Sequence, residues 1–540
     1  MHPPLSSKNK FIKTPKQTLY QMKTDLIKQI RKKLTISHAL FCVLYTTLSY
    51  VIFNALIFDK IVKWFYIKDG LDYAGLVAFM VIGFCAFIVV FALLAHRYTT
   101  KPLAIIFVIF STATVYFSIK YNVVIDSSMV MNSIHTDRTE VHELLSMQMV
   151  PYLVFLIILP ILAILLVKIK FTNPKKHLLS SAKLIAAALI IGIALIYIKF
   201  NSIQRVVNVS RKYIIYTVMP VNYIKGIGSA VQTYASPYFA GHEKKVEISG
   251  HIASEGNLVV VLAVGETSRQ QNFSLYGYSR QNTNPVLSQD KNLHLLNGIA
   301  RIGSTMYALP EILVKDGVPL PAITSKLGIS TSCYVNYTLY KICNSVGEIP
   351  VSNCGHGGNC YDEDVLPLLS ENLKSYKSGY RLIILHLGGG SHGPSYHERY
   401  PAEFQRFKPM CLDADVVNKC NIEELHNSYD NTILYVDHVV GKITDKLEKS
   451  KVPYVFIYLS DHGESLMEDG HIFHGMPPGV PLPKEQAQIP LIVKSSLPIS
   501  IIKRAEYGQQ DVYDTILGLF SIETNIRNKD KNFIKHTKQD

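Results

Sequence analysis

Three polar clusters hold the residue types that bind a metal ion or activate a hydroxyl, and each follows a run of apolar residues. The runs are Leu258–Val264, Leu382–Leu387 and Tyr454–Leu459, and the clusters are Gly265-Glu266-Thr267-Ser268, Ser391-His392-Gly393-Pro394 and Ser460-Asp461-His462-Gly463-Glu464. A carboxylate beside an imidazole at the end of a buried strand is costly unless another charge compensates it. Zinc accepts carboxylate and imidazole ligands. The sequence therefore predicts a metal site that includes Glu266, Asp461 and His462.

The elements that position these clusters are predicted to be strands of a parallel sheet. Each run is short, continuous and rich in branched residues, which is typical of strands buried on both faces. Weaker strands are predicted at Ser332–Asn336 and Pro490–Val493, and an amphipathic helix at Glu423–Leu447. Strands separated by helices indicate an α/β domain with a mostly parallel central sheet. Ligands of such sheets bind beyond the carboxyl ends of the strands, where the clusters lie.

The nucleophile of this site is not identified by residue types alone. Four hydroxyls are candidates: Thr267, Ser268, Ser304 and Thr305. The Gly303-Ser304-Thr305 turn is predicted to open a helix, so its amide groups and the positive end of the helix dipole would favour a bound phosphate. Thr305 as a helix cap is the alternative, which the residues alone favour.

The N-terminal part of the chain is predicted to be a membrane domain. Five apolar stretches are long enough to span a bilayer, and they lie at Ile36–Phe58, Ala74–Ala95, Leu103–Ile119, Val150–Val167 and Leu179–Ile198. Lys and Arg residues concentrate before the first stretch, between the second and third, and between the fourth and fifth, so these regions are predicted to be cytoplasmic. With five spans, everything after Ile198 lies outside the cytoplasm. The first stretch lacks a cleavage signature and is interpreted as a retained anchor.

The domain organisation follows from this topology. We predict a transmembrane domain at 1–200 with a basic cytoplasmic N-terminus, interfacial linker helices at 201–246, and a catalytic α/β domain at 247–540. The external loop 121–147, which contains Asp126, Asp137, Glu140 and Glu143, is either a solvated loop or an interfacial helix near the catalytic face, and we favour the helix. The net charge of +14 is distributed as membrane topology requires, so no nucleic-acid partner is expected.

Six of the eight cysteines lie in the catalytic domain, outside the cytoplasm, where disulfides form. Six cysteines allow fifteen connectivities. The simplest pairing joins nearest neighbours: Cys333–Cys343, Cys354–Cys360 and Cys411–Cys420. The other two, Cys42 and Cys85, lie in apolar stretches and are expected to be small core residues.

The order and spacing of the motifs resemble those of the lipid A phosphoethanolamine transferases, which include the mobile colistin-resistance enzymes. The resemblance covers nearly the whole chain and also includes His474-Gly475-Met476-Pro477 and Asn427-Ser428-Tyr429-Asp430-Asn431-Thr432. It implies an alkaline-phosphatase-like domain in the periplasm, anchored in the bacterial inner membrane. The implied activity transfers phosphoethanolamine from phosphatidylethanolamine to lipid A, which confers polymyxin resistance. We expect a monomer.

The same resemblance implies roles for individual residues. It selects Thr305, in the stretch from Arg301 to Pro310, as the nucleophile that carries phosphoethanolamine. It implies that Glu266, Thr305, Asp461 and His462 coordinate Zn²⁺. His392 and His474 would steady phosphoryl oxygens, act as acid or base, or bind a second metal ion. One departure is that Arg301 and Glu311 stand where the family often has a disulfide, so a salt bridge or greater mobility of the loop is expected.

Other functions remain open at this point. A sulfatase would need a C-x-P-x-R sequence, and no cysteine begins one. A phosphoglycerol transferase with a five-span anchor is harder to separate, because it also uses a threonine. A third alternative is a catalytically inactive membrane receptor. The presence of Glu266, Thr305, Asp461 and His462 argues against it, because a receptor would not need these candidate metal ligands. The sequence leaves open the acceptor (lipid A at either phosphate, core sugars or a protein), the number of metal ions and the residues that bind ethanolamine.

Overall fold

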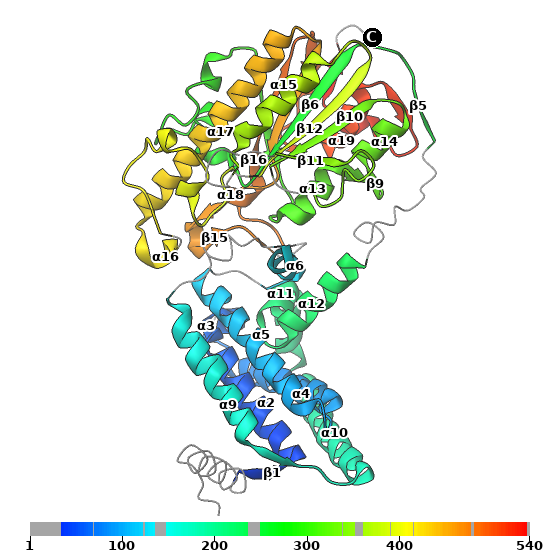
Figure 1. The fold of residues 1–540 in the computed structure, drawn as a ribbon. Helices are drawn as coiled ribbons and strands as arrows, with labels where there is room; N and C mark the ends of the chain where they lie inside the picture. Colours follow the sequence, from blue (N-terminus) through cyan, green and yellow to red (C-terminus); the bar gives the residue numbers. More distant parts are fainter. Residues whose placement is uncertain are drawn as a thin grey trace, which may run out of the picture. The chain divides into compact units, whose positions relative to one another are not determined.

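The computed structural model describes residues 34–536 apart from short gaps, and its contacts divide the chain into two compact units. The gaps are 68–69, 122–124, 136–146, 236–248, 337–338, 352–359, 389, 414 and 477–479. The first unit contains residues 1–116 and 147–223, and the second contains 117–146 and 224–540 (Figure 1). The external loop therefore groups with the C-terminal residues by its contacts.

The described part of the first unit has the five predicted membrane-spanning helices. They are α2 (His38–Ala55), α4 (Tyr73–Leu94), α5 (Thr100–Lys120), the continuous run from α8 (Met149–Tyr152) through Leu153–Ile158 to α9 (Leu159–Leu166), and α10 (Pro174–Ile198). Helix α10 begins five residues before the predicted start. The reason is local, because the Asn173 side chain accepts a hydrogen bond from the Lys176 amide and Pro174 occupies the first turn.

The predicted linker begins with two helices, α11 (Phe200–Thr217) and α12 (Val221–Tyr234). Arg205 of α11 forms an ion pair of 2.7 Å with Asp72. Just before α12, the Met219 carbonyl accepts a hydrogen bond from the Asn54 side chain. Residues 236–246 of the linker lie outside the described residues, and its association with the membrane surface stays a prediction.

The second unit is built on an eight-stranded sheet in the order β11-β10-β12-β6-β13-β16-β7-β18. Its strands are β6 (Leu258–Gly265), β7 (His294–Ile299), β10 (Ser330–Val335), β11 (Glu348–Pro350), β12 (Tyr380–Leu387), β13 (Tyr454–Ser460), β16 (Gln488–Ser495) and β18 (Tyr507–Gly508). Among these, β16 alone runs against the others. The mostly parallel sheet is confirmed, and the five strands expected from sequence are all present.

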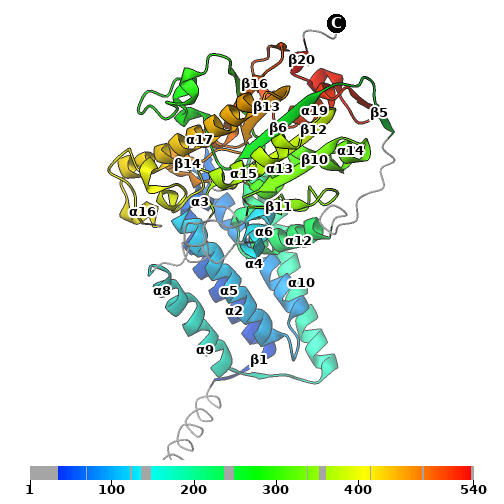
Figure 2. The same cartoon turned by 45° about the horizontal axis from the view of Figure 1, so that its top comes forward.

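Helices cover both faces of this sheet (Figure 2). Helices α13 (Thr305–Leu313), α14 (Leu320–Lys326) and α19 (Asp511–Leu519) share one core with alternate residues of the strands, such as Val260, Leu262 and Ile457. The opposite face carries α15 (Leu366–Lys374) and the long α17 (Ile422–Ser450). All eight residues of β6 are buried, as expected for a central strand with two covered faces.

Two of the three proposed disulfides are confirmed, Cys333–Cys343 and Cys411–Cys420. Cys360 is disulfide-bonded as well, while Cys354 lies outside the described residues. Cys42 and Cys85 are free and buried, as expected.

The external loop contains a helix, α6 (Ser127–His135), that packs within the second unit. Met131 is fully buried in the same core as α13. The sulfur of Met129 lies 3.5 Å from the position that a Cβ on Gly475 would occupy. The loop therefore contains the predicted helix, in contact with the helix that begins at Thr305. Asp137, Glu140 and Glu143 fall outside the described residues.

Candidate active site

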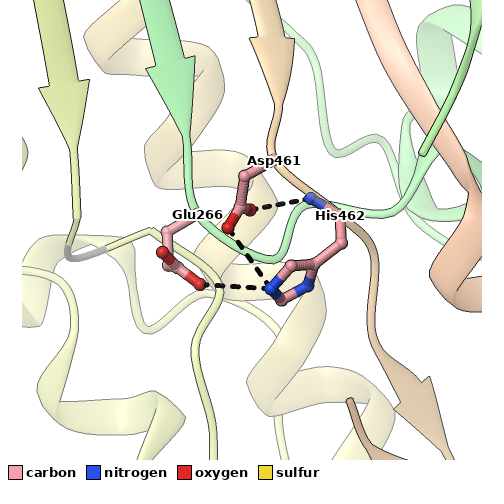
Figure 3. A group of neighbouring side chains, drawn as sticks. All are labelled: Glu266, Asp461 and His462. Carbon is pink, nitrogen blue, oxygen red and sulfur yellow. Dashed lines mark hydrogen bonds and ion pairs between the residues drawn. The ribbon is translucent and has the colours of Figure 1, made fainter. Parts of the chain in front are cut away.

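Three neighbouring strands end at the same level and bring the predicted metal ligands together. In the register of the sheet, Gly265 at the end of β6 pairs with Leu387 of β12 on one side and Ser460 of β13 on the other. Glu266, Asp461 and His462 follow directly and point toward one another (Figure 3). One ligand atom from each lies within 4.8 Å of the others, and the exposed fractions of the three residues are 2%, 0% and 0%.

Hydrogen bonds fix which atoms of this triad face its centre. Nδ1 of His462 lies 3.0 Å from the Gly463 carbonyl oxygen, so it carries the proton and Nε2 presents a lone pair. Oδ1 of Asp461 accepts the backbone amides of Thr267 and His462 at 3.0 and 2.8 Å. The other oxygen of Asp461, Oδ2, lies 3.2 Å from Nε2 of His462. Oε1 of Glu266 lies 3.8 Å from the same Nε2 atom. Three electron-rich atoms thus converge on one point.

The charge balance of the triad fits a bound cation. Burial and the neighbouring Asp461 carboxylate raise the pKa of Glu266 well above its usual value. Burial lowers the pKa of His462 to about 4, so its imidazole is neutral near pH 7. No hydrogen-bond donor among the described residues reaches Oδ2 of Asp461. Two buried carboxyl groups and a neutral imidazole are compensated best by a divalent ion, and this donor set is one that zinc accepts.

Thr305 brings its hydroxyl to the triad from a different part of the fold. It is the first residue of α13, and Oγ1 donates a hydrogen bond to Glu266, 3.0 Å from Oε1 and 3.2 Å from Oε2. The same oxygen lies 3.4 Å from Nε2 of His462. Of the four candidate hydroxyls, that of Thr305 is the one with described hydrogen bonds to the triad's side chains. The geometry places this hydroxyl where both an ion and a proton acceptor would contact it.

His392 and His474 lie next to the triad. The ring centres of His474 and His462 are 4.4 Å apart, and those of His392 and His474 are 5.1 Å apart. Nδ1 of His474 lies 2.8 Å from Oε2 of Glu464. Burial, together with the positive charge that His474 can carry, lowers the pKa of His392 well below its usual value. The two imidazoles therefore form one side of the site, and a carboxylate orients one of them.

The structure adds supporting residues whose roles were not predicted from the sequence. Glu464 is fully buried and accepts hydrogen bonds from His474 and, at 2.8 Å, from the hydroxyl of Tyr396. It stands in the Asp461–Glu464 motif, yet only the fold shows which imidazole it contacts. Tyr429 of α17 donates to the Thr267 carbonyl at 2.7 Å and accepts the Arg269 amide at 2.9 Å. These two hydrogen bonds hold the backbone turn that follows Glu266.

The loop before Thr305 is held without the family's disulfide. Within the described residues, no ion pair joins Arg301 to Glu311, so the salt bridge suggested as an alternative is absent there. Instead, the Ser304 carbonyl accepts the amides of Tyr307 and Ala308 at 3.0 and 2.8 Å, which starts α13. Contact of α13 with α6 further supports this loop.

We predict that Tyr429→Phe lowers turnover roughly 10- to 100-fold, because small displacements of catalytic groups have effects of this size. Thr267 has a φ of 50°, which is unfavourable for a β-branched residue, and the Tyr429 hydroxyl pairs both backbone groups around that turn. Tyr435→Phe is the matched control. Tyr435 lies on the same helix, is fully buried and accepts the Glu363 amide at 3.2 Å. Steady-state kinetics and thermal unfolding of both variants check this. Equal turnover in the two variants would contradict a positioning role for Tyr429.

Comparisons with known proteins show which family the chain resembles. Residues 83–235 match the family model described as phosphoethanolamine transferase EptA/EptB, and residues 316–522 match the sulfatase model. The chain is 30% identical over 492 residues to phosphoethanolamine transferase EptA of Escherichia coli K12, which covers 82% of this chain and 87% of that protein. It is 33% identical over 449 residues to EptA of Helicobacter pylori, covering 77% and 81%. The structure of lipooligosaccharide phosphoethanolamine transferase A from Neisseria meningitidis superposes with a TM-score of 0.79 at 26% identity, covering 92% of this chain and 98% of that one.

Proposed function

The chain belongs to the lipid A phosphoethanolamine transferase family, and we propose that it transfers phosphoethanolamine from phosphatidylethanolamine to lipid A through an ester on Thr305. It is a transferase of the sulfatase superfamily. The observation that carries the proposal is the hydrogen bond between the Thr305 hydroxyl and Glu266 at the edge of a triad suited to a metal ion. We place the enzyme in the bacterial inner membrane, with its catalytic unit in the periplasm.

The proposed cofactor is zinc, held by Glu266, Thr305, Asp461 and His462. Zinc, when bound, would act as a Lewis acid that lowers the pKa of a coordinated hydroxyl and offsets negative charge on phosphate oxygens. The choice of zinc rests on the donor atoms, one imidazole nitrogen with carboxylate and hydroxyl oxygens. The residues around these donors keep the ligand geometry fixed, since Asp461 is already bound to two backbone amides.

In the first half-reaction, Oγ1 of Thr305 forms a bond to the phosphorus of phosphatidylethanolamine while the bond to the glycerol oxygen breaks. Glu266 is placed to accept the hydroxyl proton, because it already accepts the Thr305 hydrogen bond. The glycerol oxygen takes up a proton as diacylglycerol leaves. The His474 imidazole is suited to supply that proton, since the Glu464 carboxylate at Nδ1 stabilises its protonated form.

In the second half-reaction, a phosphate oxygen of lipid A attacks the phosphorus of the threonine ester. The bond to Oγ1 of Thr305 breaks, Thr305 regains its proton, and lipid A leaves with an added phosphoethanolamine group. His392 and His474, whose ring centres are 5.1 Å apart, are proposed to donate hydrogen bonds to the phosphoryl oxygens as charge develops there. The added ethanolamine carries a positive charge, which gives a physical basis for resistance to the cationic polymyxins.

Mass spectrometry of lipid A from cells with and without the gene tests this function. We expect phosphoethanolamine on lipid A, release of diacylglycerol and raised survival in polymyxin only when the protein is present. Unmodified lipid A together with phosphoethanolamine on core sugars would identify the core sugars, and not lipid A, as the acceptor. Consumption of phosphatidylglycerol in place of phosphatidylethanolamine would indicate the phosphoglycerol transferase alternative.

We predict that Glu464→Gln lowers kcat by about 10- to 100-fold, the usual effect of removing a carboxylate that orients a functional histidine. The substitution keeps the size of the side chain but removes the charge that stabilises protonated His474. KM for the donor and the metal content are expected to stay near wild type, which separates this positioning role from a general loss of structure. Steady-state kinetics and elemental analysis are the measurements. An unchanged kcat would show that the Glu464–His474 contact is not used.

A further inference from the structure

One surface loop of the second unit exposes apolar side chains beside a disulfide. Residues 405–422, here called the disulfide loop, contain α16 (Val416–Lys419) and the Cys411–Cys420 bridge next to the start of α17 (Figure 1). Leu412 is 64% exposed and Ile422 is 54% exposed, the two highest values among large apolar side chains in the described residues after 247. Isolated exposed apolar side chains are common, but two of them on one rigid loop need an explanation.

The loop is rigid because covalent and hydrogen bonds join its two ends. The Cα atoms of Cys411 and Cys420 are 5.4 Å apart. The Cys411 amide also donates to the Glu424 carbonyl at 3.2 Å and to the Ser428 hydroxyl at 2.8 Å. Leu412 and Ile422 each lie within two residues of this base. The backbone at Leu412 and Ile422 is therefore held close to this base.

The exposed charges of the disulfide loop favour a lipid headgroup layer. Its exposed ionic side chains, within the described residues, are Arg406, Lys408, Asp413 and Lys419, which gives three cations and one anion, and the exposed carboxylates of Glu403 and Glu423 lie just outside its two ends. Its other carboxylate, Asp415, is only 6% exposed and forms an ion pair of 3.1 Å with Lys120. Cations beside exposed apolar side chains are the composition of segments that enter the interface of a bilayer.

The partner of Asp415 lies at the end of a helix that is suited to span a membrane. Lys120 is the last residue of α5, whose length and apolar composition suit a membrane span. Both Lys120 and Asp415 belong to the second unit, and the ion pair between them is buried. The loop is thus bonded to the residue at which a span leaves the bilayer on its external side.

We propose that the disulfide loop inserts Leu412 and Ile422 into the external leaflet of the membrane that α5 crosses. Lys408 and Lys419 then contact phosphate groups of the same leaflet. The loop would hold the catalytic unit against the surface from which its lipid donor comes. Only this last statement rests on the proposed transferase function, because insertion itself follows from the exposed side chains and the position of Lys120.

Tryptophan fluorescence of the full-length protein in lipid nanodiscs tests the insertion. The chain has one tryptophan, so Trp64→Phe gives a silent background. We expect Leu412→Trp, or Ile422→Trp if the first does not fold, to show blue-shifted emission and strong quenching by lipids with brominated acyl chains. Ile349→Trp on β11 is the matched control, because Ile349 is 43% exposed on the same unit. Quenching at position 412 or 422 no stronger than at 349 would overturn the proposal, including the case in which a second copy of the chain covers the loop.

A kinetic measurement gives an independent reading. The double variant Leu412→Ser with Ile422→Ser is expected to raise KM several-fold for phosphatidylethanolamine in bilayers but to leave it unchanged for a water-soluble short-chain analogue. Unchanged KM for the bilayer substrate would overturn the proposal. If the wild-type protein used neither substrate, the proposed function would fail, while the quenching result would still decide the insertion.

Discussion

Replacement of Thr305 by alanine is expected to lower phosphoethanolamine transfer by roughly 10³-fold or more, the scale seen when a covalent nucleophile is removed. In the proposed mechanism this hydroxyl oxygen bonds to phosphorus in the first half-reaction and releases it in the second. No other described hydroxyl has a hydrogen bond to the side chains of Glu266, Asp461 and His462. Incubation of the wild-type enzyme with donor alone should leave a phosphoethanolamine group on the peptide that contains Thr305. Mass spectrometry of that peptide and lipid transfer assays measure the two effects.

Ser304→Ala is the matched control for this substitution. Ser304 precedes Thr305, is 1% exposed, and its hydroxyl makes no hydrogen bond within the described residues. Its loss should therefore leave transfer close to wild type. Thr305→Ser should keep part of the activity, because the oxygen remains but its rotamer is less restricted. Full transfer by Thr305→Ala, or a labelled peptide from another part of the chain, would refute the covalent scheme.

The fold was predictable where burial dictates the pattern of residues. β6, β12 and β13 are covered on both faces by helices, so each is a continuous apolar run that can be recognised without its neighbours. β7 was not predicted, because Asn297 and Gly298 interrupt a six-residue strand that is only partly buried. Its pairing with β16 and β18 supplies the stability that its own residues do not indicate.

The same physical distinction separates predictable from unpredictable parts of the site. Residues that directly follow central strands must meet at one edge of a parallel sheet, so Glu266, Asp461 and His462 could be grouped from their positions. Thr305 reaches the triad from the start of a helix after β7. Residue types alone favoured a helix cap at this position, and only the resemblance selected Thr305 among four candidate hydroxyls. Tyr429 and Glu464 act by contacting other residues, and such contacts exist only in the folded chain.

Asp461→Asn is expected to abolish metal binding and to lower transfer by roughly 10³-fold, since a catalytic metal contributes several kcal/mol to the stability of the transition state. Asparagine keeps the shape of the side chain, and its oxygen can still accept the amides of Thr267 and His462 that Oδ1 accepts now. What it removes is the negative charge at Oδ2, beside the lone pair of His462. The folded structure should survive while the ion is lost. Elemental analysis and transfer assays measure the two losses.

Asp437→Asn separates this effect from the cost of altering a buried carboxylate. Asp437 is fully buried in α17 and also accepts two backbone amides, those of Leu287 and Val286 at 3.0 and 2.8 Å, but it lies outside the triad. Its substitution should reduce the free energy of unfolding by about 1–3 kcal/mol and leave metal content unchanged. A chelator should lower the melting temperature of wild type and Asp437→Asn, because an ion that binds only the folded state stabilises it, and should have no effect on Asp461→Asn. Metal content equal to wild type in Asp461→Asn would show that the ion, if present, is held elsewhere, and the role assigned to Thr305 would lose its physical basis.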